Sequence, residues 1–391
     1  MMRRIVAQLH LWVGLLFCVP LVMLGLTGSI LVFEQELNAL FAPRRSPAAQ
    51  GKPRAIDEIL LAARQAAPPG FRPVSYVAPS EAGGMAAVRL APSGRGGAVG
   101  PSGERVRIDV DPVSLQTYVN PEAGFLRQVF YLHSTLLLRN RDGRQLVGWL
   151  GAAMLAMAIS GLVNWWPRRR RWRASFTIAR GARGYRLHRD LHGAVGIWGL
   201  AVFAVVTAAG VYLSFPESIR GAVDLLLPAR DLRAAASAAR VEPIPGSEPL
   251  AIDAAVALAR ERVPDTEPRL VLPPARPDQP VRVALRRDGD DRHGPAVTVL
   301  VDQWARRVIE VFDPRDFTAG ETILAWQHAL HAGEGLGPVW KMLVFLSGLL
   351  PLLFTITGIL MWLLRRRRRK MPAAGSDSLG DPVYTARRAG G

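Results

Sequence analysis

Histidines are the residues of this sequence best suited to chemistry, and six of the seven lie at the ends of long apolar runs. These six are His10, His133, His188, His192, His328 and His331. A neutral imidazole is a common metal ligand, and one imidazole on each face completes the coordination of a six-coordinate haem iron. Such a site forms only if the secondary-structure elements that carry these histidines bring two of them close together.

Four charge-free apolar runs carry the histidines at or near their ends. The runs cover residues 9–33, 146–166, 193–215 and 342–364 of the 391-residue chain. Each run is long enough, at 1.5 Å per helical residue, to cross a hydrocarbon core about 30 Å thick. The sequence therefore predicts a membrane protein built on a bundle of four transmembrane α-helices.

The formal net charge of +17 is distributed unevenly, and its distribution predicts an orientation. Residues 1–8, 167–192 and 365–391 together hold 19 Lys/Arg and 3 Asp/Glu, whereas residues 34–145 hold 14 and 10, and residues 216–341 hold 16 and 19. Short basic segments beside spans favour the cytoplasmic side. We expect a bacterial inner-membrane protein with a cytoplasmic N-terminus (1–8), loop (167–192) and tail (365–391), and with two periplasmic domains. The basic charge indicates contact with the membrane surface, and no nucleic-acid partner is expected.

The chain also repeats itself. An offset of 182 residues places the first run over the third, and an offset of 197 places the second over the fourth. The positions that match are His10/His192, Gly14/Gly196, Gly28/Gly210, Gly151/Gly348, Ser160/Thr357, Gly161/Gly358 and Trp165/Trp362. Because each copy begins and ends on the same side, the spans are expected to form a parallel 2+2 repeat.

The two external segments match as well. Helical patterns over 56–66 and 252–262 each precede strand candidates, which lie near residues 74–77, 107–110 and 115–119 in the first segment, and near 270–272, 298–301 and 307–312 in the second. Each segment therefore predicts a small α+β domain, with one helix against a short antiparallel sheet. The glycine-rich stretch 83–103 is expected to be a loop or hairpin tip.

The repeat converts the scattered histidines into two candidate pairs. We name His10 and His192 the inner pair, and His133 and His331 the outer pair; His188 and His328 are alternates one turn away. Gly14 and Gly196 each follow an inner histidine by four residues, on the same helix face, where a missing side chain would make room for a flat macrocycle. Close helix packing is the other explanation for these glycines.

A zinc or copper site is the chemical alternative, because His188/His192 and His328/His331 are spaced for chelation, with Glu334 near the second couple. It leaves His10 and His133 without a role. No Cys-x-x-Cys-His is present, so a haem would be a non-covalent b-type haem. The cytoplasmic segments are too short for a dinucleotide domain, so no NAD or flavin site is expected. Electrons would come from membrane quinol or from a separate cytoplasmic reductase.

Motifs spread over nearly the whole chain resemble those of the PepSY-associated transmembrane proteins, which include bacterial inner-membrane ferric-siderophore reductases. They are Leu9-His-Leu-Trp-Val-Gly-Leu, Tyr131-Leu-His-Ser-Thr, Asp190-Leu-His-Gly-Ala-Val-Gly, Leu330-His-Ala-Gly-Glu-Gly-Leu-Gly and Thr357-Gly-Ile-Leu-Met-Trp. The resemblance implies that both periplasmic domains are PepSY-like and that the protein is an oxidoreductase with two bis-histidine haems b. It also implies a periplasmic ferric-siderophore substrate, whose iron(III) is reduced to iron(II) and released.

Two other functions stay open. A non-redox siderophore permease would need polar residues along a midplane cavity, and the spans offer few. A PepSY-type periplasmic regulator would need no haem.

Overall fold

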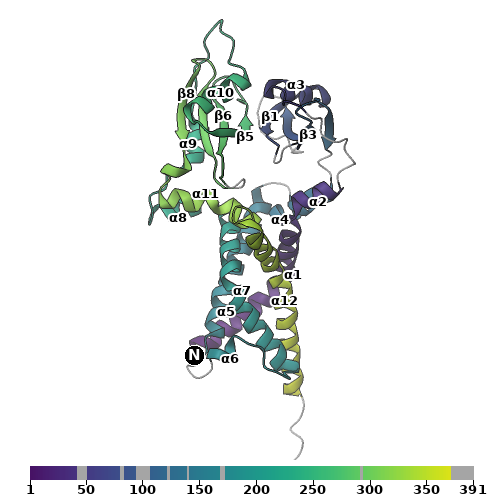
Figure 1. Ribbon diagram of the computed structural model, residues 1–391. Coiled ribbons are helices and arrows are strands. Elements are labelled where there is room, and N and C mark those ends of the chain that lie inside the picture. The colour runs from purple at the N-terminus through teal and green to yellow at the C-terminus, as the bar shows by residue number, and fades with distance from the viewer. Residues whose placement is uncertain are drawn as a thin grey trace, which may run out of the picture.

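Four long helices form the stem of the molecule (Figure 1). The computed structural model describes residues 1–41, 51–79, 83–93, 106–120, 124–138, 141–167, 172–290 and 294–370. The helices are α1 (Met2–Leu31), α5 (Arg141–Trp165), α7 (Gly184–Ser214) and α12 (Gly337–Lys370). All four are long and apolar enough to cross a membrane, as the apolar runs predict. Both α1 and α7 pack against α5 and α12, which closes a four-helix bundle.

Small residues let α1 and α12 approach closely. A Cβ atom added at Gly25 would collide with the carbonyl oxygen of Gly348, and one added at Gly348 would collide with Ser29. The Ser29 hydroxyl donates to the carbonyl oxygen of Phe345 at 2.9 Å. Without water between spans, such small-residue contacts and interhelical hydrogen bonds are the main source of helix association.

Shorter helices surround the two ends of the bundle. At the end that faces the sheet, α4 (Phe125–Thr135) and α11 (Ala319–Ala332) cross over the long helices (Figure 1). The helix α4 packs on α1 and α5, whereas α11 packs on α7, α8 and α12. The remaining short elements are α2 (Glu34–Phe41), α6 (Trp172–Ser175), α8 (Pro216–Asp224), α9 (Leu232–Ala238) and the 3₁₀ turn η2 (Pro314–Asp316).

Beyond the bundle lies an eight-stranded antiparallel sheet in the order β4-β3-β2-β1-β5-β6-β7-β8. Two helices, α3 (Ile56–Ala66) and α10 (Ile252–Arg262), share one hydrophobic core with it. The strands are β1 (Phe71–Val77), β2 (Ala86–Pro92), β3 (Val106–Val110), β4 (Thr117–Asn120), β5 (Thr266–Leu272), β6 (Val281–Arg287), β7 (Val297–Asp302) and β8 (Arg307–Phe312).

The sequence patterns explain most of these elements. The predicted helices over 56–66 and 252–262 are confirmed, because their apolar residues recur at helical spacing and face the core, as Ile59, Leu60 and Ala63 do. The prediction of a loop over 83–103 is wrong for β2, where Ala86, Val88 and Leu90 alternate into the core. Residues 94–103 of that stretch lie outside the described residues. Strand β6 adds to the strands that the sequence predicts.

The two external segments are joined, although the sequence suggests two separate units. Strand β1 pairs with β5 through Tyr76↔Val271 and Val77↔Leu270, so one sheet runs through both. The helix N-termini are also joined: the Asp253 carboxylate accepts from the backbone N–H groups of Ile56 and Asp57, both at 2.9 Å. In return, the Asp57 carboxylate accepts from Ile252 at 3.2 Å and from Asp253 at 3.0 Å. Each aspartate therefore caps the other helix.

Candidate functional site

Both predicted histidine pairs meet in space. His10 on α1 and His192 on α7 have ring centroids 6.3 Å apart and ring planes at 74°. His133 on α4 and His331 on α11 have ring centroids 5.8 Å apart and ring planes at 38°. In each pair, the two imidazoles come from different halves of the chain, which is what the aligned repeat predicts.

Hydroxyl groups hold the inner pair through one ring nitrogen each. The Nδ1 atom of His10 lies 2.8 Å from the Ser160 hydroxyl, and that of His192 lies 2.8 Å from the Thr357 hydroxyl. Each hydroxyl also donates its single proton to a carbonyl oxygen of its own helix, Ser160 to Met157 at 3.1 Å and Thr357 to Leu353 at 2.7 Å. When the hydroxyl proton is donated along the helix, the hydroxyl oxygen accepts from Nδ1–H, and the lone pair of each imidazole is then on Nε2.

Backbone carbonyl groups impose the same state on the outer pair. His133 Nδ1 lies 3.1 Å from the carbonyl oxygen of Leu24, and His331 Nδ1 lies 2.8 Å from that of Val206. A carbonyl oxygen only accepts, so both Nδ1 atoms carry protons and both Nε2 atoms keep their lone pairs. Burial lowers the pKa of both rings, to about 4 for His133, which keeps the imidazoles neutral near pH 7. Second-sphere hydrogen bonds of this type orient histidine ligands in metal sites.

A cavity of about 850 Å³ opens beside the outer pair and reaches into the bundle. Both outer histidines line it, together with Gly28, Gly210 and the alternate histidine His328. Most of its wall is apolar, and its charged lining residues are Glu34, Arg144, Glu334 and Lys341. An apolar cavity with a few convergent polar groups is the usual form of a cofactor site.

Glycines lie against the imidazole rings. A Cβ atom at Gly28 would lie 3.0 Å from Cε1 of His133, and one at Gly210 would lie 2.8 Å from Cε1 of His331. At the inner pair, a Cβ atom added at Gly161 would lie 3.4 Å from Cε1 of His10, and one added at Gly358 would lie 4.0 Å from Cε1 of His192. Sequence reasoning aligned these four glycines but gave them no role in the site.

The two glycines that the sequence favoured, Gly14 and Gly196, have other neighbours. A Cβ atom at Gly14 would lie 3.1 Å from the Met157 side chain, and one at Gly196 would lie 3.8 Å from the Phe354 ring. Both therefore border the adjacent long helix. The Phe354 ring in turn packs on His192, with centroids 4.9 Å apart.

The alternate histidines lie outside the paired rings. His188 is half-buried on α7 one turn before His192, and His328 is exposed on α11, at the wall of the large cavity. Among the described residues, no three His, Cys, Asp or Glu side chains gather as a zinc or copper centre requires. His293 lies outside the described residues.

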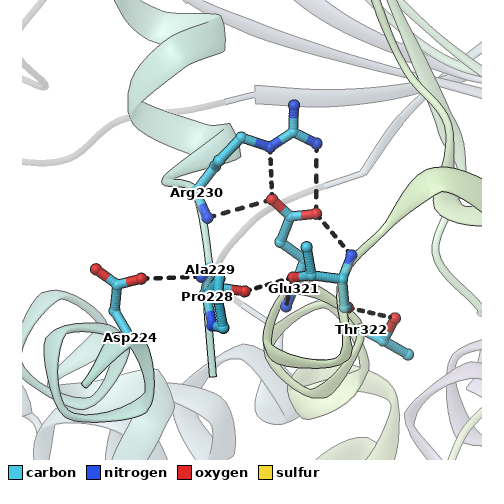
Figure 2. Close-up of polar contacts among 7 residues, drawn as sticks. Asp224, Pro228, Ala229, Arg230, Glu321 and Thr322 are labelled. Atoms are coloured by element: carbon cyan, nitrogen blue, oxygen red, sulfur yellow. Dashed lines mark hydrogen bonds and ion pairs between the residues drawn. The ribbon is translucent and has the colours of Figure 1, made fainter. Parts of the chain in front are cut away.

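The start of α11, the helix that carries His331, is clamped by a buried carboxylate (Figure 2). The Glu321 side chain accepts from the Arg230 guanidinium at 2.6 Å, from the Arg230 backbone at 3.2 Å and from the Thr318 backbone at 3.0 Å. The hydrogen bond from Arg230 lowers the pKa of Glu321, so the carboxylate stays charged. The clamp fastens the segment between α8 and α9 to the first turn of α11.

One family model covers most of the chain. The pattern that describes the PepSY-associated TM region matches residues 7–365, which reach from α1 into α12 and include both histidine pairs. Comparison with curated protein sequences finds no match. The chain belongs to the family of proteins with a PepSY-associated transmembrane region.

Proposed function

We propose that this protein is a transmembrane electron-transfer oxidoreductase that holds two haems b, one between the inner and one between the outer histidines. The observation that carries the proposal is the hydrogen bonding of the four imidazoles. Each has its Nδ1 atom 2.8–3.1 Å from a protein oxygen, an arrangement that would leave Nε2 available to hold a haem iron.

The spacing of the rings fits one iron per pair. Two opposed imidazoles that bind one metal at about 2 Å, with each ring centre ~1.1 Å beyond its nitrogen, have centres about 6 Å apart. The observed separations are 6.3 Å and 5.8 Å. The large cavity and the glycines against the outer rings supply room for a flat ligand beside this pair.

A bound haem would supply one-electron chemistry, and the chain's own residues would orient it and exclude water. Ser160 and Thr357 fix the inner imidazoles, whereas the backbone of α1 and α7 fixes the outer ones. Met154, Phe203 and Pro351 give the cavity an apolar wall towards the middle of the bundle. Electrons would move from the inner to the outer pair across the hydrocarbon core.

The basic segments support an orientation in the bacterial inner membrane with both termini in the cytoplasm, so the sheet would lie in the periplasm. The hydrogen bonds support a parallel 2+2 repeat, because Leu24 and Val206, the acceptors of His133 and His331, match at the offset of 182. The helix-over-four-strands pattern of each half supports two PepSY-like domains.

The proposed substrate is a periplasmic ferric siderophore. Transfer of one electron from the outer site would convert its iron(III) to iron(II), which hard oxygen ligands hold less tightly, so the iron would be released. The electron donor would be membrane quinol or a separate cytoplasmic reductase, since neither a flavin nor an NAD site is expected in this chain.

Absorption spectra of the purified protein test the proposal. We expect a Soret band that shifts on reduction with dithionite, with two haems per chain. His10→Ala and His192→Ala should each remove the inner haem alone, and His133→Ala and His331→Ala the outer haem alone. His188→Ala and His328→Ala are matched controls that should keep both haems.

Three results would contradict the proposal. Absence of haem from protein made with an ample haem supply would favour a regulator or a permease. Loss of both haems from one well-folded single variant would refute the pairing. Loss of a haem in the His188 or His328 variant would show that this alternate histidine, and not its neighbour in the pair, holds the haem.

A further inference from the structure

A second cavity, of about 240 Å³, lies in the sheet half formed by β5–β8, between the sheet and α9. Val281, Val283 and Leu285 of β6 belong to the core that the sheet shares with α10. Arg282 and Ala284 alternate with them and line this cavity on the opposite face. The cavity is therefore separate from both histidine pairs.

Most of the cavity wall is apolar, and two arginines interrupt it. Leu270 and Leu272 of β5 form part of the floor, Phe312 and Phe317 form part of the wall, and Arg233 reaches it from α9. Burial lowers the pKa of Arg282, and the positive charge of Arg233 lowers it further. Two cations therefore face the same apolar space.

Neighbouring arginines differ from these two because they have acidic partners. Arg220 pairs with Asp231 at 3.0 Å, and Arg286 pairs with Glu267 at 4.0 Å. Within the described part of the chain, no carboxylate pairs with Arg233 or Arg282. Arg282 is half-buried, whereas Arg233 is exposed. A half-buried guanidinium without a counter-charge is costly, and an anion from solution would remove that cost for Arg282.

We propose that this cavity binds a small organic carboxylate with a flat apolar body. The carboxylate would bridge the guanidinium groups of Arg233 and Arg282, which present planar pairs of donors, and the body would lie over Leu270 and Leu272. In other proteins, an apolar cavity of about 150 Å³ holds one benzene molecule. A cavity of about 240 Å³ has room for such a ring and a carboxylate. This site does not depend on haem.

Titration calorimetry of the full-length protein in lipid nanodiscs tests the site with benzoate, neutral benzamide and inorganic phosphate. We expect saturable binding of one benzoate, and at least tenfold weaker binding of the other two probes. Arg233→Gln and Arg282→Gln should each weaken benzoate binding at least tenfold. Arg286→Gln, on the same strand but paired with Glu267, is the matched control and should bind as the wild type does.

Thermal unfolding supplies a second readout that needs no ligand. Arg282→Gln removes an uncompensated charge, so its melting temperature should rise above that of the wild type, whereas benzoate should raise only that of the wild type. Equal binding of benzamide would refute the role of charge, and equal binding of phosphate would refute the role of the apolar body. Unchanged benzoate affinity in the exposed Arg233→Gln variant would refute the site even if Arg282→Gln failed to fold.

Discussion

At the scale of single residues, the two histidine pairs differ in the groups that lie against their Nδ1 atoms. Side-chain hydroxyls serve the inner pair, and backbone carbonyls, with the hydroxyl of Thr27 also 3.1 Å from His133, serve the outer one. A hydroxyl can be removed by substitution, but a backbone carbonyl cannot. The inner pair is therefore the one whose ring orientation can be changed without substitution of a histidine.

Thr357→Val tests this dependence. Valine has nearly the shape of threonine but cannot accept from His192, so the ring loses its orientation. We expect haem affinity at the inner site to fall by about 10–100-fold, the usual effect of losing such a partner. Haem transfer to apomyoglobin measures it, and the outer haem should transfer at its wild-type rate. Thr355→Val, on the same helix, is the control; equal loss in both variants would contradict the hydrogen-bond argument.

Glycines against the rings allow a second test at this scale. A Cβ atom at Gly210 would lie 2.8 Å from His331, too close for any real contact, whereas one at Gly358 would lie 4.0 Å from His192. Gly210→Ala should therefore displace His331 and cost about 1–3 kcal/mol of stability. Gly358→Ala, its counterpart in the other pair, should be tolerated. Thermal unfolding and haem content measure both, and equal behaviour of the two variants would show that the ring does not pack as described.

At the scale of elements, sequence patterns predict those parts that depend on local periodicity. The four apolar runs and the helices α3 and α10 follow from such patterns, and so do most strands. The alternation of buried and partly buried residues in β6 is a local pattern of the same kind. Partners far apart in the chain, such as Glu321 and Arg230, are set by tertiary packing and leave no local pattern.

For the candidate site, the aligned repeat predicts the inner pair directly, because His10 and His192 match at the offset of 182, and it places His331 one residue from the position that matches His133. It also aligned Ser160 with Thr357 and Gly28 with Gly210, but alignment does not say which side chain faces which ring. That information depends on helix rotation, which sequence spacing leaves open. The spacing also predicts Gly14 and Gly196 beside the inner pair, and a Cβ atom there would meet Met157 and Phe354 respectively.

The clamp at the start of α11 gives a prediction at the element scale. Glu321→Gln keeps the size of the side chain but removes its charge, so the contacts with Arg230 and with the backbone of Thr318 weaken. We expect a loss of about 1–3 kcal/mol at pH 7. Thermal unfolding measures it. Glu310→Gln, an exposed change of the same charge near Arg230, is the control and should lie within about 0.5 kcal/mol of the wild type.

The clamp also predicts a pH dependence. Because the hydrogen bond from Arg230 holds the pKa of Glu321 below its ordinary value of 4.5, its contribution is complete above that pH and is lost as the pH falls through the folded-state pKa. Wild-type protein should therefore lose more stability than Glu321→Gln between pH 6 and about pH 3.5. Parallel stability curves for the two proteins would contradict the assignment.

At the scale of the whole molecule, the reciprocal caps make the two sheet halves one body. Asp57 stabilises the first turn of α10, and Asp253 stabilises the first turn of α3. The two halves also share a continuous core. A substitution that destabilises one half should therefore also destabilise the other.

Hydrogen exchange can detect this coupling. In Asp57→Ala, the amides of Ile252 and Asp253 lose their acceptor, so the start of α10 should exchange faster although the substitution lies in α3. The cost should be about 0.5–2 kcal/mol, as for other lost helix caps. Glu58→Ala, which removes a half-exposed neighbour paired with Arg54, should leave α10 unchanged. Faster exchange confined to α3 would show that the caps do not cross.

The pairing of β1 with β5 also has a consequence for biosynthesis. A ribosome completes β1–β4 long before it makes β5, and α5 and α7 are synthesised between them. During that interval β1 is an open sheet edge with unpaired backbone groups, which is a template for unwanted pairing with other chains. The nascent first half therefore needs protection, by a chaperone or by the membrane surface, until the second half arrives. Substitutions that delay α5 or α7 should lower the yield of protein through aggregation of a half that is itself unchanged.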